Sequence, residues 1–164
     1  VALSTLDGGR VSLAVGSLGA AQRALDLSVD YLRQNQSEGG NLSNRQSIQW
    51  KLADVAMEVY ASKFMCYNNL TELEKYYEVI ESKEKVPRQL RDRVSRGSAI
   101  SKAYVSEVAS RAITTAIEIQ GLAGIADGSE TERGFRDSFI AEIYEGTNDI
   151  QRMIIAKELL GLGL

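Results

Sequence analysis

The sequence VSLAVGSLGAAQRALDLSVDYL, residues 11–32, is the clearest guide to the architecture because its apolar side chains recur every three or four positions. This spacing aligns them along one face of an α-helix. They are Ala14, Leu18, Ala21, Leu25, Val29 and Leu32. Glycine and asparagine at residues 39–41 break the pattern, and Ser43 or Asn44 can cap a following helix. A first long helix is therefore predicted, followed by a turn.

Two further long helices are predicted downstream. The second carries apolar residues at positions 48, 52, 55 and 59 and continues with polar residues to roughly residue 83. Pro87 marks the corner after it, because proline is favoured at a first helical position. A glycine-containing run, residues 121–128, ends the third helix, whose apolar residues are Val94, Val105, Val108, Ala112, Ala116 and Ile119.

The last part of the chain contains a short helix around Arg133–Ile140 and a final helix from about Asp149 to Leu160. Alternating β-branched residues are nearly absent, so strands are not expected. Long amphipathic helices with short loops predict an all-α fold, an antiparallel up-down four-helix bundle with a short extra helix before the last helix. The third and last helices are expected to keep some apolar surface for a partner subunit.

Composition excludes several classes of function. The 164 residues, 44 % hydrophobic and 25 % charged, suit one globular domain, and a formal charge of −3 gives no reason to expect nucleic acid. No apolar run approaches the ~18–20 residues that cross a bilayer. The chain has no histidine and a single cysteine, which excludes histidine-dependent nucleophiles, histidine-based metal sites and intrachain disulfides. A reducing compartment is expected, cytoplasmic or the mitochondrial matrix in a eukaryote.

A second stretch, IYEGTNDIQ at residues 143–151, is the strongest candidate for a functional site. Asn148 followed three residues later by Gln151 resembles a capping box, which places Glu145 in the loop before the last helix. Gly146 allows a ligand to approach, and the free N–H groups of a helix start favour an anion or carbonyl oxygen. Two interpretations stay open locally: Glu145 is a surface carboxylate in a capped turn, the commoner case, or a base that acts once ligand excludes water.

Extended to IYEGTNDIQRMIIAKELLG, this stretch resembles the C-terminal signature of the acyl-CoA dehydrogenases. Further motifs match in the family's order: STLDGGR at residues 4–10, Gln46 with KLADVA at 51–56, and ERGFRD at 132–137. The spacing from Arg136 to Glu145 also matches, and the register holds from residue 6 to residue 160. Several ungapped motifs in order are far more specific than any one alone.

The resemblance implies an FAD-dependent enzyme that desaturates acyl-CoA thioesters. In that family the glutamate at the position of Glu145 abstracts the α proton while the β hydrogen leaves as hydride to the flavin. The resemblance also implies that Asp7, Arg10 and Gly146 lie near the bound acyl-CoA. A minority of members carry the base just before the arginine of the first motif, but that position is Gly9 here. For Arg10, a solvated residue at a helix start remains the alternative.

The resemblance also implies contacts to FAD from Gln46, Gly121, Thr147, Asn148 and Asp149. Three further flavin positions depart from the family: Asn35 replaces an arginine, Glu118 a glutamine and Leu122 a glycine. In the motif of Asn35, Glu38 replaces an aromatic residue and only Gly39 matches. Losing a cation at 35 and gaining an anion at 118 both disfavour a pyrophosphate. Weaker or altered FAD binding is therefore a hypothesis.

The resemblance covers one domain of the family, the C-terminal helical bundle, here residues 1–164. A chain that begins with Val1 is expected to be a fragment without the family's N-terminal helical and middle β domains. Implied partners are an acyl-CoA substrate, an electron-transfer flavoprotein-like acceptor and further copies in a homotetramer or dimer, and the isolated domain is expected to be inactive.

An alternative belongs to a different class. It is a flavin-poor or non-catalytic member acting as an oligomerisation or assembly domain, which Asn35 and Glu118 favour and the intact Glu145-Gly146-Thr147 opposes. A helical interaction module unrelated to the family would require the ordered motif matches to be accidental.

Overall fold

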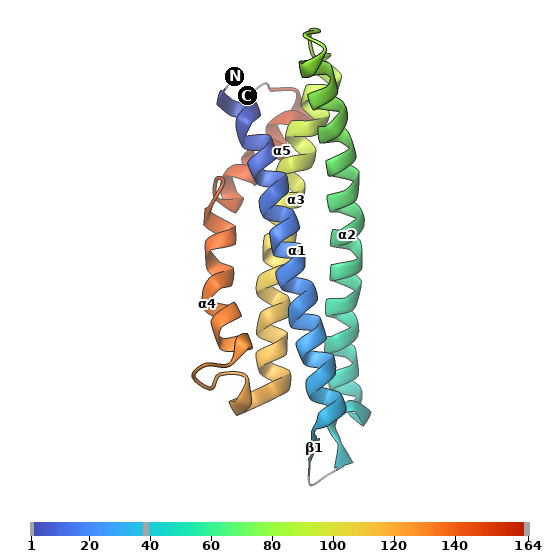
Figure 1. The fold of residues 1–164 in the computed structure, drawn as a ribbon, viewed down its shortest axis with the longest axis vertical. Helices are drawn as coiled ribbons and strands as arrows, with labels where there is room; N and C mark the ends of the chain where they lie inside the picture. The colour runs from blue at the N-terminus through green and yellow to red at the C-terminus, as the bar shows by residue number, and fades with distance from the viewer. Residues whose placement is uncertain (1, 38–39, 163–164) are drawn as a thin grey trace.

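The structure, a computed structural model, describes residues 2–37 and 40–162, with side chains for 6–35 and 41–162. Three long helices run the length of the molecule in alternating directions, and two shorter helices follow them (Figure 1). The helices are α1 (Ala2–Gln34), α2 (Gln46–Glu81), α3 (Arg88–Gln120), α4 (Glu130–Ile143) and α5 (Asn148–Leu160). The predicted all-α bundle with an additional short helix before the last one is confirmed.

A small hairpin between α1 and α2 was not expected from the sequence. Two-residue strands, β1 (Gln36–Ser37) and β2 (Gly40–Asn41), pair antiparallel, and the 3₁₀ helix η1 (Leu42–Asn44) follows. Strands this short carry no alternating pattern, so the sequence shows only the turn. The flavin-motif residues Glu38 and Gly39 lie outside the described residues.

Two predicted helix caps are wrong by one or two residues. Neither Ser43 nor Asn44 caps α2, because both belong to η1, where the side chain of Asn41 accepts a hydrogen bond from the Ser43 N–H at 3.0 Å. The residue before α2 is Arg45, which makes no side-chain cap. At α5 the cap is Thr147 rather than Asn148, whose side chain turns into the protein.

Two helices are longer than their apolar stripes indicate. α1 extends back to Ala2 because polar residues, Asp7 and Arg10, continue its buried face where the stripe stops. α4 begins at Glu130, since Ser129 caps it by accepting a hydrogen bond from the Glu132 N–H at 3.0 Å.

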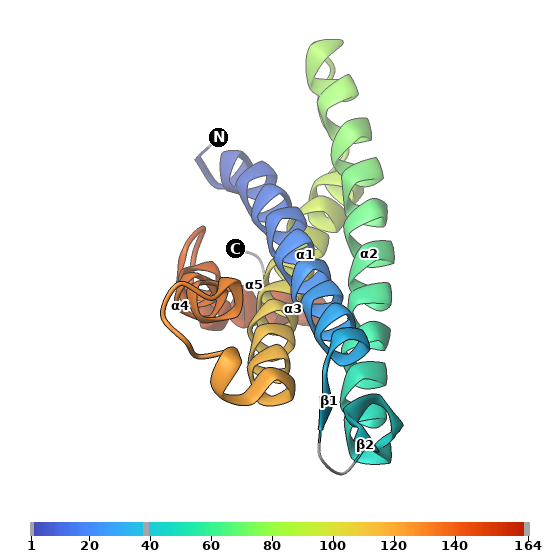
Figure 2. The ribbon, with the colours of Figure 1, turned by 60° about the horizontal axis from the view of Figure 1, so that its bottom comes forward.

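α3 is the central helix, in contact with α1, α2, α4 and α5 (Figure 2). Small side chains let its neighbours approach closely, and each buried Val or Ile contributes roughly 1.5–3 kcal/mol. The main core cluster consists of Ala21, Ala24, Val55, Val59, Val108, Ala109, Ala112, Ile113 and Ala116. The expectation of a spare apolar face on α3 is therefore wrong: no large apolar side chain of this helix is exposed, whereas α2 and α5 expose several.

Different segments meet in two parts of the bundle (Figure 1). The α4–α5 connection lies beside the first turns of α1 and near the middle of α3, where Lys102 contacts it. The end of α1, the hairpin, the start of α2 and the end of α3 lie together at one end. With 33 residues, α3 measures about 50 Å at a rise of ~1.5 Å per residue. Throughout the described residues, each helix is too polar or too short to pass through a lipid bilayer.

Candidate active site

Glu145 lies in the α4–α5 connection, with its carboxylate against the start of α1. A Cβ atom placed on Gly9 would lie 2.5 Å from Oε2 and 3.0 Å from Oε1 of Glu145. Side-chain carbons do not approach other atoms that closely, so only glycine leaves room for the carboxylate. Gly9 cannot itself act as a base. Because it has no side chain, it leaves the space in which the carboxylate of the candidate base lies.

The backbone of this turn is strained and is held from inside the protein. Glu145 has φ +56° and Gly146 has φ +91°, the left-handed region. A non-glycine residue there costs on the order of 1–3 kcal/mol unless its surroundings fix it. The fully buried Gln151 does so: its Nε2 donates to the carbonyl oxygens of Gly146 at 2.9 Å and Glu145 at 3.3 Å. The sequence pattern had suggested only a helix cap for Gln151.

Asp7 and Arg10 form a buried ion pair on α1. Nη1 of Arg10 donates to Oδ1 of Asp7 at 2.9 Å, and the hydroxyl of Ser98 donates to the same oxygen at 2.9 Å. Burial raises the pKa of the Asp7 carboxyl, although the bonds from Ser98 and Arg10 act in the opposite direction. Arg10 is only 3 % exposed, which excludes a solvated residue at a helix start. Its Nε has no hydrogen-bond partner within the described residues.

A buried lysine beneath the loop was missed by sequence reasoning. Lys102 of α3 is fully buried, and its Nζ donates to Oδ1 of Asn148 at 2.8 Å and to the carbonyl oxygen of Glu142 at 3.1 Å. Burial lowers the pKa of Lys102 to about 8. A signal was present, because Lys102 falls between Ser98 and Val105 on the inner face of the helix.

The side chain of Asn148 is also used within the domain. Its Nδ2 donates to the Ser106 hydroxyl at 3.0 Å, and only 6 % of the residue is exposed. Of the residues matched to flavin contacts at this end, Thr147 and Asp149 remain on the surface.

The other residues matched to flavin contacts lie at the far end of the bundle. Glu118 forms an ion pair with Lys51, and both side chains are half exposed. Asn35 directly follows α1, and its Nδ2 donates to the Tyr31 carbonyl oxygen in the last turn of that helix at 2.9 Å. The remaining matched positions lie at exposed helix ends, Gln46 at the start of α2 and Gly121 and Leu122 directly after α3.

The structure therefore divides the candidate residues into two sets. One set surrounds the α4–α5 connection and the start of α1, and comprises Asp7, Arg10, Glu145, Gly146, Thr147, Asn148 and Asp149. The second set lies at the opposite end, and comprises Asn35, Gln46, Glu118, Gly121 and Leu122. The α4–α5 connection contacts Lys102 near the middle of α3, and Glu118 lies 16 residues further along that helix, about 24 Å at a rise of ~1.5 Å per residue. The two sets of candidate residues are therefore separate within one chain.

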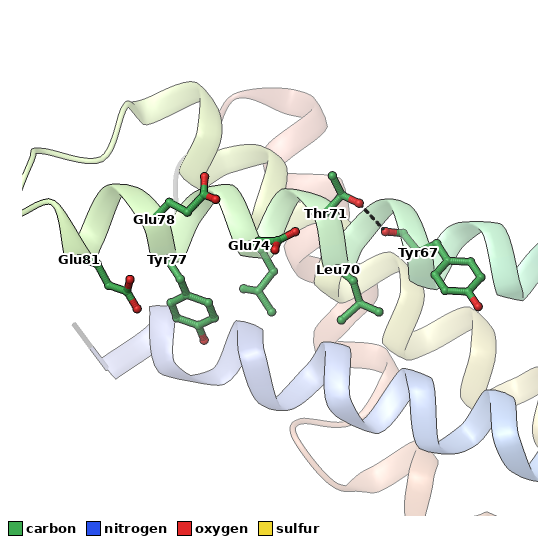
Figure 3. A pocket seen from close by; sticks show the side chains of 8 residues that line it. Tyr67, Leu70, Thr71, Glu74, Tyr77, Glu78 and Glu81 are labelled. Atoms are coloured by element: carbon green, nitrogen blue, oxygen red, sulfur yellow. Dashed lines mark hydrogen bonds between the residues drawn. The ribbon is translucent and has the colours of Figure 1, made fainter.

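A hollow in the second half of α2 is lined by residues of that helix (Figure 3). Leu70 and Tyr77 point toward α1 in it, and Glu74, Glu78 and Glu81 also line it. A Cβ on Gly8 would lie 2.6 Å from the Tyr77 hydroxyl, so adjacent glycines of α1 accommodate side chains of two different elements. Within the described residues, no group of three His, Cys, Asp or Glu side chains could hold a metal ion.

Comparison with known proteins identifies relatives over the whole fold. The family "Acyl-CoA dehydrogenase, C-terminal domain" matches residues 1–160. A probable acyl-CoA dehydrogenase of Bacillus subtilis, YngJ, is 38 % identical over 161 residues, which cover 96 % of this chain and 38 % of that protein.

Two solved structures share the fold at comparable identity. Butyryl-CoA dehydrogenase from Megasphaera elsdenii superposes with a TM-score of 0.81 at 34 % identity, over 97 % of this chain and 38 % of that one. An acyl-CoA dehydrogenase from Bacillus anthracis complexed with FAD gives 0.84 at 30 % identity, over 99 % and 29 %. The chain thus spans well under half the length of the relatives it matches.

Proposed function

This chain belongs to the acyl-CoA dehydrogenase family as its C-terminal domain, and from that premise we propose that Glu145 abstracts the α proton of an acyl-CoA thioester. The packing of the Glu145 carboxylate against Gly9 carries the proposal. A surface carboxylate in an ordinary capped turn needs neither a strained φ nor a neighbour without a side chain. Both features fix the direction from which the oxygens meet a substrate.

The surroundings of the carboxylate suit a base that works without water. Ile143, Tyr144 and Ile150, which flank the loop, are exposed apolar side chains. An acyl chain or a neighbouring domain that covers them removes water from the carboxylate, which strengthens it as a base. Asp7, Arg10 and Gly146 are proposed to lie near the bound acyl-CoA, and the buried ion pair keeps the start of α1 in place.

The flavin, when bound, supplies the acceptor for the β hydrogen. We propose that Thr147 and Asp149 of one chain and Gln46 and Gly121 of another approach the same flavin, since the two sets of candidate residues are separate within one chain. This requires self-association. The complete protein is proposed to carry the family's N-terminal helical and middle β domains, and to pass electrons to an electron-transfer flavoprotein-like acceptor.

A second candidate function is an assembly domain without flavin chemistry. Two side chains at the far end favour it: Asn35 bonds to the last turn of α1, and Glu118 pairs with Lys51. Neither offers a positive charge to a pyrophosphate. Released FAD per chain, measured after denaturing the complete protein, separates the two: a near-stoichiometric amount supports the enzyme, and none after reconstitution supports assembly.

The role of Glu145 is tested by Glu145→Gln in the complete protein. Exchange of the acyl-CoA α proton with deuterated solvent should fall by roughly 10²–10⁴-fold, the range for loss of a general base. Binding of acyl-CoA should stay nearly unchanged. Glu74→Gln, an exposed carboxylate on α2, is the matched control and should keep full exchange. Full exchange in Glu145→Gln would remove Glu145 from this role.

A further inference from the structure

We propose that Lys102 is a positioning residue for Glu145, because its buried ammonium group ties together the two helix ends that bracket the base's loop. The inference rests on the proposed function of Glu145. One bond goes to the carbonyl oxygen of Glu142 in the last turn of α4 at 3.1 Å. The other goes to the side chain of Asn148, the first residue of α5, at 2.8 Å. Residues 143–147 lie between these two points.

The second anchor is itself fixed to α3. Asn148 donates through Nδ2 to the Ser106 hydroxyl at 3.0 Å, which orients its Oδ1 toward Lys102. Gln151 binds the same loop through the carbonyl oxygens of Glu145 and Gly146. The left-handed backbone of Glu145 is thus held from both sides, and the carboxylate stays against Gly9.

Burying an ammonium group at this position is energetically unfavourable in itself. Burying a charge costs several kcal/mol unless hydrogen bonds and neighbouring charges repay it, and an apolar side chain of similar length would pack without that cost. Charges from every neighbouring element act on Lys102: Glu142 of α4, Glu107 of α3 and Glu145 of the loop favour its charged form, and Arg10 of α1 opposes it.

Removing Lys102 should have a measurable effect on the rate. Losing the anchors lets the loop shift, and displacement of a reacting group by about 1 Å can cost on the order of 10²-fold in rate.

The test uses the complete enzyme with Lys102→Met, Lys102→Gln and the exposed control Lys75→Met. For both Lys102 variants we expect kcat to fall at least about 10-fold with KM within about twofold. Lys75→Met should match the wild type in both. Circular dichroism at the assay temperature gives the folded fraction.

The outcomes separate this inference from the proposed function. A kcat that falls only as the folded fraction does overturns it. So does failure of both Lys102 variants to fold, because the lysine would then be a structural residue. If Glu145→Gln keeps full exchange, the proposed function fails. If Glu145→Gln abolishes exchange while the Lys102 variants keep kcat, only this inference fails.

Discussion

Among single residues, Glu145 and Gly9 act as a pair, in which one supplies a carboxylate and the other supplies the space for it. The oxygens of Glu145 lie where a Cβ of residue 9 would be, at 2.5 Å and 3.0 Å. The glycine is therefore as specific a feature of the site as the glutamate. Its effect is steric and can be tested without altering any charge.

Gly9→Ala should lower kcat by roughly 10²-fold, because the new methyl group pushes the carboxylate of Glu145 out of position. Gly19→Ala is the matched control: Gly19 lies on the same helix, and nothing lies within 4 Å of its Cβ position. This control should keep its activity and gain up to about 1 kcal/mol of stability from helix propensity. Steady-state kinetics and thermal unfolding check both, and equal activities would contradict the steric argument.

Lys102 should make stability depend on pH in the alkaline range. Burial lowers its pKa from 10.5 to about 8, while the unfolded chain keeps the ordinary value. Between those values the unfolded state binds the additional proton, so this group makes the free energy of unfolding rise with pH. The full effect is at most about 3 kcal/mol. Denaturant unfolding of the wild type and Lys102→Met at pH 7 and 10 should show it. From pH 7 to pH 10, the free energy of unfolding of the wild type should rise relative to that of Lys102→Met.

At the scale of helices and turns, apolar periodicity predicts what apolar packing builds. The stripes of α1, α2 and α3 identify these helices because regularly spaced Val, Leu and Ala fill their contacts. Periodicity fails where polar groups take over the buried face, as with Asp7 on α1 and Lys102 on α3. The hairpin was not predicted because a two-residue strand is too short to show apolar–polar alternation.

The candidate site was predicted in part, and for a chemical reason. Glu145 and its loop follow from a resemblance that rests on ordered motifs. Contacts between distant segments do not: the approach of Gly9 to Glu145 and of Lys102 to Asn148 depends on how α1 and α3 meet the α4–α5 connection. A capping pattern suggested only that Asn148 lies at a helix start, because the direction of its side chain depends on Ser106 and Lys102.

α2 presents an apolar face to solvent, and we predict that it mediates self-association. The exposed side chains lie one or two turns apart on the outer side of the helix: Trp50, Met57, Tyr60, Phe64 and Tyr67. The residues of α2 that are buried lie on the opposite side of the helix, among them Val55, Val59 and Leu73. Contiguous exposed aromatic side chains are typical of protein interfaces.

Phe64→Glu should therefore dissociate the oligomer, because a charge would have to be desolvated within an apolar interface. Sedimentation velocity of the complete protein measures the change. Lys75→Glu, on the same helix beyond the apolar face, is the control and should leave the sedimentation coefficient unchanged. A Phe64→Glu protein that sediments like the wild type would place the interface elsewhere.

For the whole molecule, charge at the far end should control flavin affinity. Glu118 forms a half-exposed ion pair with the ammonium group of Lys51 at this end. Glu118→Gln should release Lys51 to a pyrophosphate and tighten FAD binding up to about fivefold, the equivalent of ~1 kcal/mol for an exposed pair. Flavin fluorescence titration of the apoprotein measures the affinity. Glu132→Gln, which also leaves an arginine without its carboxylate, is the control, and equal gains in both would exclude a local effect.

The separation of the two sets of candidate residues has a consequence for inheritance as well as for chemistry. If the base of each chain works on a flavin that the hairpin end of a neighbouring chain helps to hold, a substitution at that end impairs the neighbour's catalysis, not the chain's own. Two differently defective alleles, one altered at Glu145 and one at the hairpin end, would then complement each other in mixed oligomers. The outcome of combining two defective alleles would then depend on which of the two sets of residues each allele alters.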